Sequence, residues 1–278
     1  MANVFDTFLV YPIINTLVAV YQVLNLVHIP YALGFSIIIL TILIRFVLYP
    51  LTAAQLKSSK KMQDVAPHLS KLKEKHKGDA KRLQAETMRL YKEHGVNPVA
   101  GCLPVIIQLP IIWALYSVLQ KVVSFNSHTI VTEVNKIVYP INFLKLTAPW
   151  DPTFFGIPLG KNPGQLINIM PLIILVPLLT ALFQFLQSKM LFSPKKELEE
   201  NKKKDKKEKN EKEDFATAFQ TQSTYIFPLM IGFFSYSFPI GLSLYWNTFT
   251  LFGILQQYKI SGLGGLAQWK EKIIGIKK

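Results

Sequence analysis

The chain has 278 residues, of which half are hydrophobic, and its formal net charge is +14. Its positive mean hydropathy and several long uncharged runs indicate a membrane protein. Its lysines cluster in polar blocks beside the apolar runs, and this position favours a cytoplasmic membrane face over nucleic-acid recognition. Cys102 is the only cysteine, so an intrachain disulfide is excluded, and because neither a zinc-binding motif nor a Gly-rich phosphate loop is present, we expect no cofactor and no metal.

Residues 1–30 contain no Lys or Arg, so the charged start of a signal peptide is missing. The stretch 5–27 is apolar at helical spacing, but Asn15, Gln22 and Asn25 interrupt it. This pattern favours a helix lying in the membrane interface, although the length also allows a spanning helix.

Arg45 lies inside the apolar run 31–52, which is long enough to form the first spanning helix. The run contains no Asp or Glu, and a charge at the centre of a membrane helix costs roughly 3 kcal/mol. An arginine snorkelling from the helix end is the alternative. Because Arg45 lies about a turn and a half before Pro50, we favour a cation that faces water or a polar cavity. Thr41, one turn earlier, shares its face.

Residues 53–99 form a polar block rich in Lys and Arg, which places it in the cytoplasm and the N-terminus outside. Two intermittent apolar stripes, separated by Lys77-Gly78-Asp79, predict a helical hairpin. Its charged surface suits either partner binding or simple solvation.

The rest of the chain predicts alternating membrane and polar segments. We expect spanning helices at 101–123, 165–188, 222–238 and 240–259, an external loop at 124–164, a charged cytoplasmic loop at 189–221 and a basic cytoplasmic tail at 260–278. Within the charged loop, the mixed-sign stretch 193–214 has no apolar face and is expected to be flexible. The prediction is an all-α polytopic membrane protein with about five spanning helices, its N-terminus outside and its C-terminus in the cytoplasm.

Several motifs, in order from about residue 30 to 260, resemble the YidC/Oxa/Alb family of membrane protein insertases. They are Thr41–Arg45 with Tyr49–Thr52, Leu90–Lys92 with Val96–Pro98, Gly101–Cys102 with Pro104, Gln108–Pro110 with Ala114–Tyr116, and Phe238–Leu242 with Leu244–Trp246. The large periplasmic domain typical of Gram-negative members and the lipoprotein cysteine of many Gram-positive members are absent. The short tail weakens any expectation of strong ribosome binding.

The resemblance implies a groove that opens to the cytoplasm and the lipid but not to the outside. The residues expected to line it are Arg45, Thr41, Gln108, Gln187, Ser243, Tyr245, Trp246 and Asn247. The uncharged hydrogen-bonding groups among them would keep Arg45 hydrated, and a low dielectric would strengthen its attraction for acidic client tails. The client's hydrophobic segment would leave into lipid near the third and fifth spanning helices.

The expected partners are nascent membrane proteins and the lipid bilayer, with the ribosome, the signal recognition particle pathway and the Sec translocon as further candidates and no direct nucleic-acid recognition. The expected location is the plasma membrane. Without a nucleotide site, transfer would be driven by the client's own partitioning, so the chain is not expected to be an enzyme. Because clients vary, we expect the charge of Arg45 to matter more than the planar shape of its guanidinium. We therefore expect Arg45→Lys to retain much activity.

Two alternatives come from other classes. A small-molecule or ion transporter would call for carboxylates within the membrane or for inverted repeats, which the apolar segments lack. A scaffold that is merely anchored in the membrane would have no reason to bear the cost of Arg45.

Overall fold

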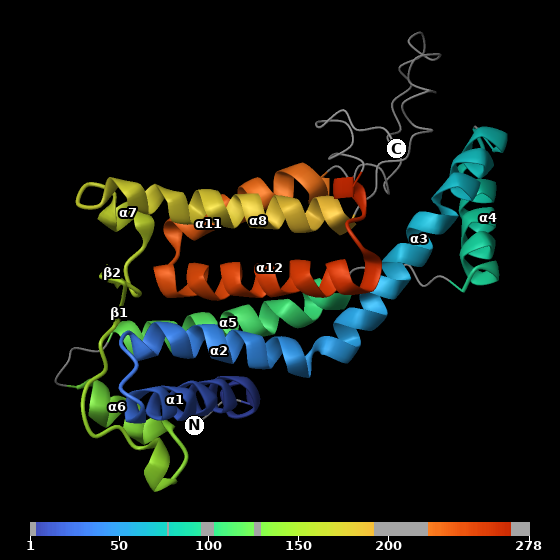
Figure 1. Ribbon diagram of the computed structural model, residues 1–278. Coiled ribbons are helices and arrows are strands. Elements are labelled where there is room, and N and C mark those ends of the chain that lie inside the picture. The colour runs from blue at the N-terminus through green and yellow to red at the C-terminus, as the bar shows by residue number, and fades with distance from the viewer. Residues whose placement is uncertain (1–3, 77, 96–102, 125–128, 192–221, 268–278) are drawn as a thin grey trace. The chain divides into compact units, whose positions relative to one another are not determined.

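A computed structural model describes residues 4–76, 78–95, 103–124, 129–191 and 222–267 (Figure 1). The chain divides into two compact units. The first comprises 1–48, 106–184 and 228–252, and the second comprises 49–105, 185–227 and 253–278. Helices account for nearly all regular structure in the described ranges, which confirms the predicted all-α fold class.

The first unit contains most of the helices and a short hairpin of two antiparallel strands. Its elements are η1 (Asp6–Val10), α1 (Tyr11–Leu26), α2 (Ala32–Val47), most of α5 (Leu103–Ser124), α6 (Ile130–Ile137), η3 (Asn142–Leu144), β1 (Thr153–Phe154), β2 (Ile157–Pro158), α7 (Pro163–Leu166), η4 (Pro171–Ile174), the first part of α8 (Leu175–Leu191), α11 (Phe227–Ser237) and the first part of α12 (Ile240–Ser261). The second unit contains α3 (Tyr49–Lys75), α4 (Ala80–Glu93), η5 (Gln222–Ile226) and the ends of α8 and α12.

Two described stretches, Asp6–Leu26 and Pro171–Leu191, have the length and composition to cross a membrane. The helix α2 and the start of α3 meet the same criteria together, across a break at Leu48, which would raise the number to three. The break lies before the predicted boundary at residue 52, because Pro50 has no N–H with which to continue the hydrogen-bond ladder of α2. These stretches support an integral membrane protein, and the total of five spans stays a prediction.

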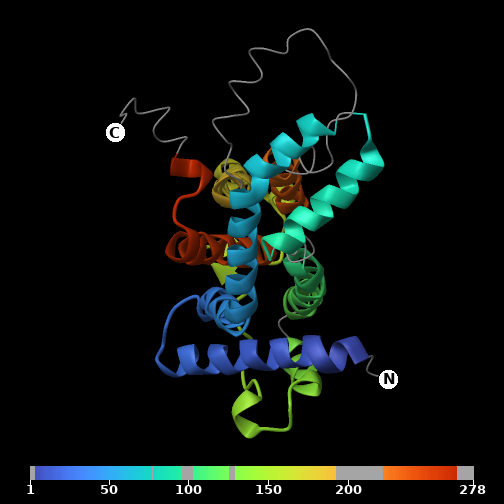
Figure 2. The ribbon, with the colours of Figure 1, turned by 90° about the vertical axis from the view of Figure 1, so that its right-hand side faces the viewer.

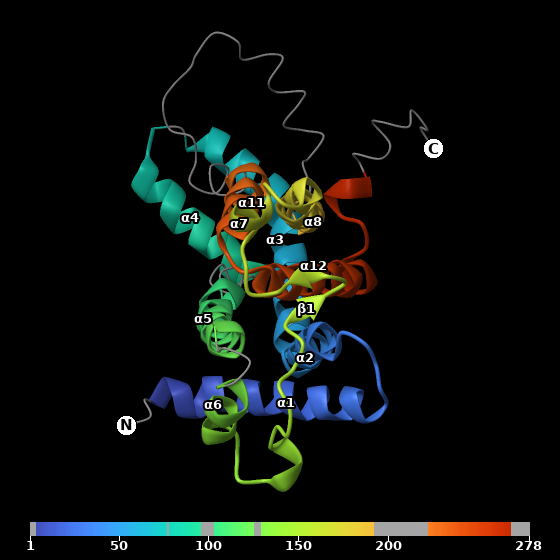
Figure 3. The same ribbon diagram turned by 90° about the vertical axis from the view of Figure 1, so that its left-hand side faces the viewer.

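The helix α12 lies at the centre of the first unit, between the pair α8 and α11 and the pair α2 and α5 (Figures 1 and 3). Buried side chains from several helices form the core below it. They include Ile14 and Leu17 of α1, Leu33 and Ile37 of α2, and Val118 of α5. Within a membrane, lipid is as apolar as these side chains, so their close packing against one another, and not removal from water, stabilises the arrangement. The core therefore fixes α2 against its neighbours.

A close backbone approach joins the strand hairpin to the start of α2 (Figure 3). A Cβ atom on Gly34 would lie 2.0 Å from the nearest ring carbon of Phe154. Only glycine leaves room for that ring. The ring also packs edge-on against Phe35, with centroids 5.3 Å apart, so the hairpin covers one end of the helix that carries Arg45.

The polar residues that interrupt the apolar pattern of α1 bind the segment between α6 and β1. The Oδ1 atom of Asn15 accepts from the backbone N–H of Tyr139 at 2.7 Å, and Nε2 of Gln22 donates to the carbonyl of Lys145 at 2.8 Å. Figure 2 shows α1 lying across the view while α2 is seen nearly along its axis, so the two helices cross steeply. The interfacial position of α1 stays a prediction, because the same helix has the length and composition to cross a membrane.

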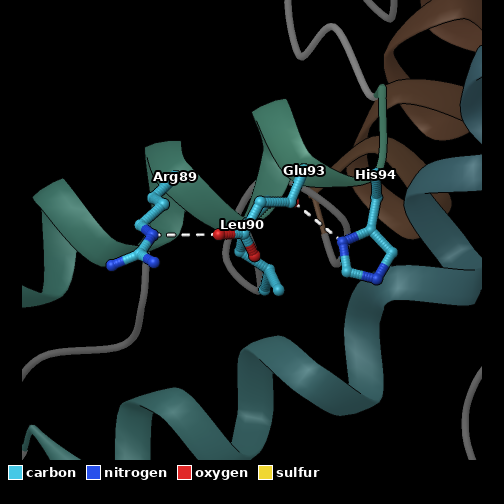
Figure 4. Close-up of polar contacts among 4 residues, drawn as sticks. All are labelled: Arg89, Leu90, Glu93 and His94. Carbon is cyan, nitrogen blue, oxygen red and sulfur yellow. Dashed lines mark hydrogen bonds and ion pairs between the residues drawn. The ribbon is translucent and has the colours of Figure 1, made fainter.

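In the second unit, α3 and α4 form the predicted helical hairpin. The turn between them contains Gly78 at a φ of 97°, and the Asp79 side chain caps α4 by accepting from the Arg82 N–H at 2.9 Å. Near the end of α4, Arg89 pairs with Glu93 at 2.9 Å and the His94 ring lies 2.9 Å from the Leu90 carbonyl (Figure 4). The cytoplasmic location of this hairpin stays a prediction.

The placement of α1 can be tested with single cysteines at Thr7 and Asn25, which are both exposed and lie about 27 Å apart along a helix. In a Cys102→Ser background, both should react with an impermeant maleimide in intact cells if α1 lies on the outer surface. A cysteine at Lys71 in α3 should react only after the membrane is disrupted. Labelling at one end of α1 alone would show that α1 spans the membrane.

Candidate functional site

The side chain of Arg45 is buried in the first unit, with 4% of it exposed. Its Nε and Nη2 atoms donate to the backbone carbonyl of Phe249 in α12, at 3.0 and 2.5 Å. Its Cζ atom lies 3.4 Å from the centroid of the Phe249 ring. The hydration of this cation stays a prediction. A guanidinium is weakly hydrated, so a carbonyl and an aromatic face can take the place of water around it.

Thr41 lies one turn before Arg45 and is fully buried. Its Oγ1 donates to the carbonyl of Ile37 at 2.6 Å. Thr41 and Arg45 therefore lie on the same face of α2, as predicted, but the hydroxyl of Thr41 donates its hydrogen bond within its own helix.

A second polar contact reaches α12 from α5. The Nε2 atom of Gln108 donates to the hydroxyl of Tyr245 at 2.7 Å, and only 1% of Tyr245 is exposed. The Tyr245 ring lies 5.7 Å from the Phe249 ring, one turn further along α12. Together these four residues, Arg45, Gln108, Tyr245 and Phe249, form what we call the Arg45 cluster, which joins α2, α5 and α12.

Another set of predicted residues meets α8 and α11. The Oγ atom of Ser243 lies 2.8 Å from Oγ of Ser235, which in turn lies 3.2 Å from Oγ1 of Thr180. We call these three residues the hydroxyl cluster. Beside it, Nε1 of Trp246 donates to Oε1 of Gln184 at 3.3 Å.

The hydroxyl cluster lines a small cavity of about 10 Å³, which is room for roughly one water molecule. Its other lining residues are Ile231, Phe234, Phe238, Leu242 and Trp246. The lining is therefore mainly apolar with a few hydroxyl groups, and it does not include Arg45.

The two clusters lie on opposite sides of α12. At 3.6 residues per turn, Tyr245 and Phe249 share one face, whereas Ser243, Trp246 and Asn247 fall largely on the other. The predicted site residues thus separate into two groups instead of lining one surface. Among the described residues, the buried Oδ1 of Asn247 has no hydrogen-bond partner. Gln187 belongs to the second unit.

Sequence reasoning missed Phe249, Ser235, Thr180 and Gln184 as members of these clusters. A backbone carbonyl acts as the acceptor for Arg45, and every residue type has one, so no pattern could have identified Phe249. The hydroxyls of Ser235 and Thr180 did offer a signal, because they stand within apolar runs.

Large apolar side chains are exposed along η4, α8 and α11. They include Leu172, Leu175, Leu178, Leu229 and Phe233, with Leu172 exposed by 78%. Many large apolar side chains exposed on neighbouring helices are typical of contact with a membrane or with another chain. It borders the helices that supply the hydroxyl cluster.

The family model described as "60Kd inner membrane protein" matches residues 22–263. The chain is 34% identical over 231 residues to membrane protein insertase YidC of Fusobacterium nucleatum, covering 83% of this chain and 87% of that protein. It is 32% identical over 264 residues to membrane protein insertase YidC of Oceanobacillus iheyensis, covering 93% of this chain and 84% of that protein. It is 30% identical over 270 residues to ALBINO3-like protein 1, chloroplastic, of Arabidopsis thaliana, covering 91% of this chain and 48% of that protein.

The contact between Gln108 and Tyr245 predicts a measurable contribution to stability. Tyr245→Phe removes the acceptor and leaves the amide of Gln108 unpaired, so the thermal midpoint in detergent should fall by about 2–4 °C, as expected for the loss of roughly 1 kcal/mol. Adding Gln108→Leu to Tyr245→Phe should lower it little further. Fully additive losses would show that the two side chains do not interact.

Proposed function

From the premise that the chain belongs to the YidC/Oxa/Alb family of membrane protein insertases, we propose that Arg45 receives the acidic tails of client proteins during insertion. The chain is an integral membrane protein whose relatives are named as insertases, and the transporter alternative finds no support among them. Its clients are nascent membrane proteins, and it releases them into the lipid bilayer.

The observation that carries the proposal is the bond from Arg45 to the Phe249 carbonyl. A guanidinium presents its N–H groups in a rigid planar fork, so it can exchange one oxygen acceptor for another. A client carboxylate would make a stronger bond than the neutral carbonyl does, because both partners of the bond would be ionised. The low dielectric around Arg45 would increase that attraction further. Gln108 and Tyr245 hold the α5 side of the same cluster in place.

We assign the path of the hydrophobic client segment to the other face of α12. The exposed leucines of α8 and the exposed side chains of α11 offer apolar surface beside the cavity. The hydroxyl cluster would supply hydrogen bonds to polar groups as they pass. Transfer to lipid then releases about 0.8 kcal/mol per buried CH₂ group. The proposed mechanism needs no chemical reaction, so we do not regard the chain as an enzyme.

The lysine distribution supports a topology with the hairpin of α3 and α4, the segment 189–221 and the C-terminus in the cytoplasm. The N-terminus and the segment between α5 and α8 would face outside. The charged stretch 193–214 and most of the basic tail lie outside the described residues. We propose the charged hairpin as the surface for the ribosome, the signal recognition particle pathway or the Sec translocon.

A panel of clients that differ only in the charge of the translocated tail tests the role of Arg45. In proteoliposomes, Arg45→Ala should lower insertion of the acidic clients by about tenfold, the effect of a loss of 1.4 kcal/mol, and should leave a strongly hydrophobic neutral client nearly unchanged. Thermal unfolding of the variant checks that it remains folded. Equal losses across the panel would indicate structural damage, and normal insertion of every client would contradict the proposal.

Arg45→Lys separates charge from shape. The variant keeps the charge but loses the planar fork and the flat contact with Phe249. This geometry revises the expectation drawn from charge alone. Insertion of acidic clients by the lysine variant should fall between the wild-type and Arg45→Ala values. A value equal to the wild type would assign the effect to charge alone. A value equal to Arg45→Ala would assign it to shape alone.

A further inference from the structure

We infer that the aromatic ring of Phe249 is a displaceable cover over Arg45, which admits acidic clients and excludes neutral groups. The inference rests on the proposed function, because it assigns to Phe249 a positioning role at the same site. Two parts of one residue act on the guanidinium. The carbonyl accepts from Nε and Nη2, and the ring lies flat against the group, 3.4 Å from Cζ to the centroid.

The exposure of the two side chains places the ring on the outer side of the contact. Arg45 is buried, whereas Phe249 is half-buried, although Phe249 neighbours the fully buried Tyr245 on the same face of α12. A client group that approaches Arg45 across this face therefore meets the ring first. Access requires the ring to move to another staggered rotamer, since the backbone of a helix cannot shift in the same way.

The strengths of the competing contacts give the cover its selectivity. A cation–π contact is weaker than a charge-assisted hydrogen bond between a guanidinium and a carboxylate. Because both partners are then ionised, a carboxylate binds the guanidinium more strongly than a neutral amide or hydroxyl does, so it displaces the ring more readily. The cover would keep Arg45 from engaging the uncharged parts of client chains between insertion events.

The substitution Phe249→Leu isolates the ring, because the backbone carbonyl stays and the new side chain is still large and apolar. Phe249→Tyr keeps an aromatic face and should behave like the wild type. The matched control is Phe252→Leu in the same helix. The ring of Phe252 packs on Phe46 with centroids 5.4 Å apart, so this variant loses an aromatic contact of similar kind away from Arg45.

The first readout is the rate at which phenylglyoxal modifies Arg45 in the full-length protein in proteoliposomes, followed by mass spectrometry of the Arg45 peptide. Phe249→Leu should raise the rate roughly three- to tenfold, the range that corresponds to the loss of one cation–π contact. Phe249→Tyr and Phe252→Leu should leave it unchanged. An unchanged rate in Phe249→Leu, or an equal rise in Phe252→Leu, would overturn the cover.

The second readout is insertion of the client panel. Phe249→Leu should reduce the ratio of acidic to neutral client insertion by raising insertion of the neutral members, with Phe252→Leu unchanged. One outcome would overturn the proposed role of Arg45 and leave the cover as a structural feature. In that outcome, Phe249→Leu is labelled faster, but insertion does not depend on tail charge in any variant. Unchanged labelling together with insertion that still depends on tail charge would overturn the cover and leave the proposed function standing.

Discussion

The bond between Arg45 and the Phe249 carbonyl is the contact on which the candidate site depends. It joins α2 to α12 through a charged side chain that the apolar helix around it would otherwise exclude. The carbonyl and the ring of a single residue stabilise that charge from two directions. On the proposed function, these neutral contacts can be exchanged for a client carboxylate, which binds a guanidinium more strongly.

The helix α12 makes this arrangement possible because its two faces do different work. One face meets Arg45 and Gln108, and the other meets the hydroxyl and amide groups of α8 and α11. A client with a polar tail and an apolar segment presents the same two kinds of surface. On the proposed function, recognition of the tail and passage of the segment would be altered by separate substitutions on one helix.

The helical class and the charged hairpin could be predicted from sequence because hydropathy, charge and proline positions are local properties. The division of the site could not. Ser243, Tyr245, Trp246 and Asn247 are near neighbours in sequence, and only the packing of α12 among four helices shows that they face different partners. The polar residues of α1 posed a related difficulty. Asn15 and Gln22 interrupt an apolar pattern, but their backbone partners lie far away in the chain.

That distance has a consequence for how the protein is made. The Asn15 side chain and the Tyr139 N–H that it binds are 124 positions apart in the chain, and the partners of Gln22 are 123 apart. During synthesis, α1 emerges long before the residues that fix it, so the side chains of Asn15 and Gln22 lack these partners until then. Contacts of such high sequence separation form late, because a long loop must close first. Docking of α1 would then wait until residues 139–145 have been made, yet it would still precede the bond between Arg45 and Phe249, whose residues are 204 positions apart.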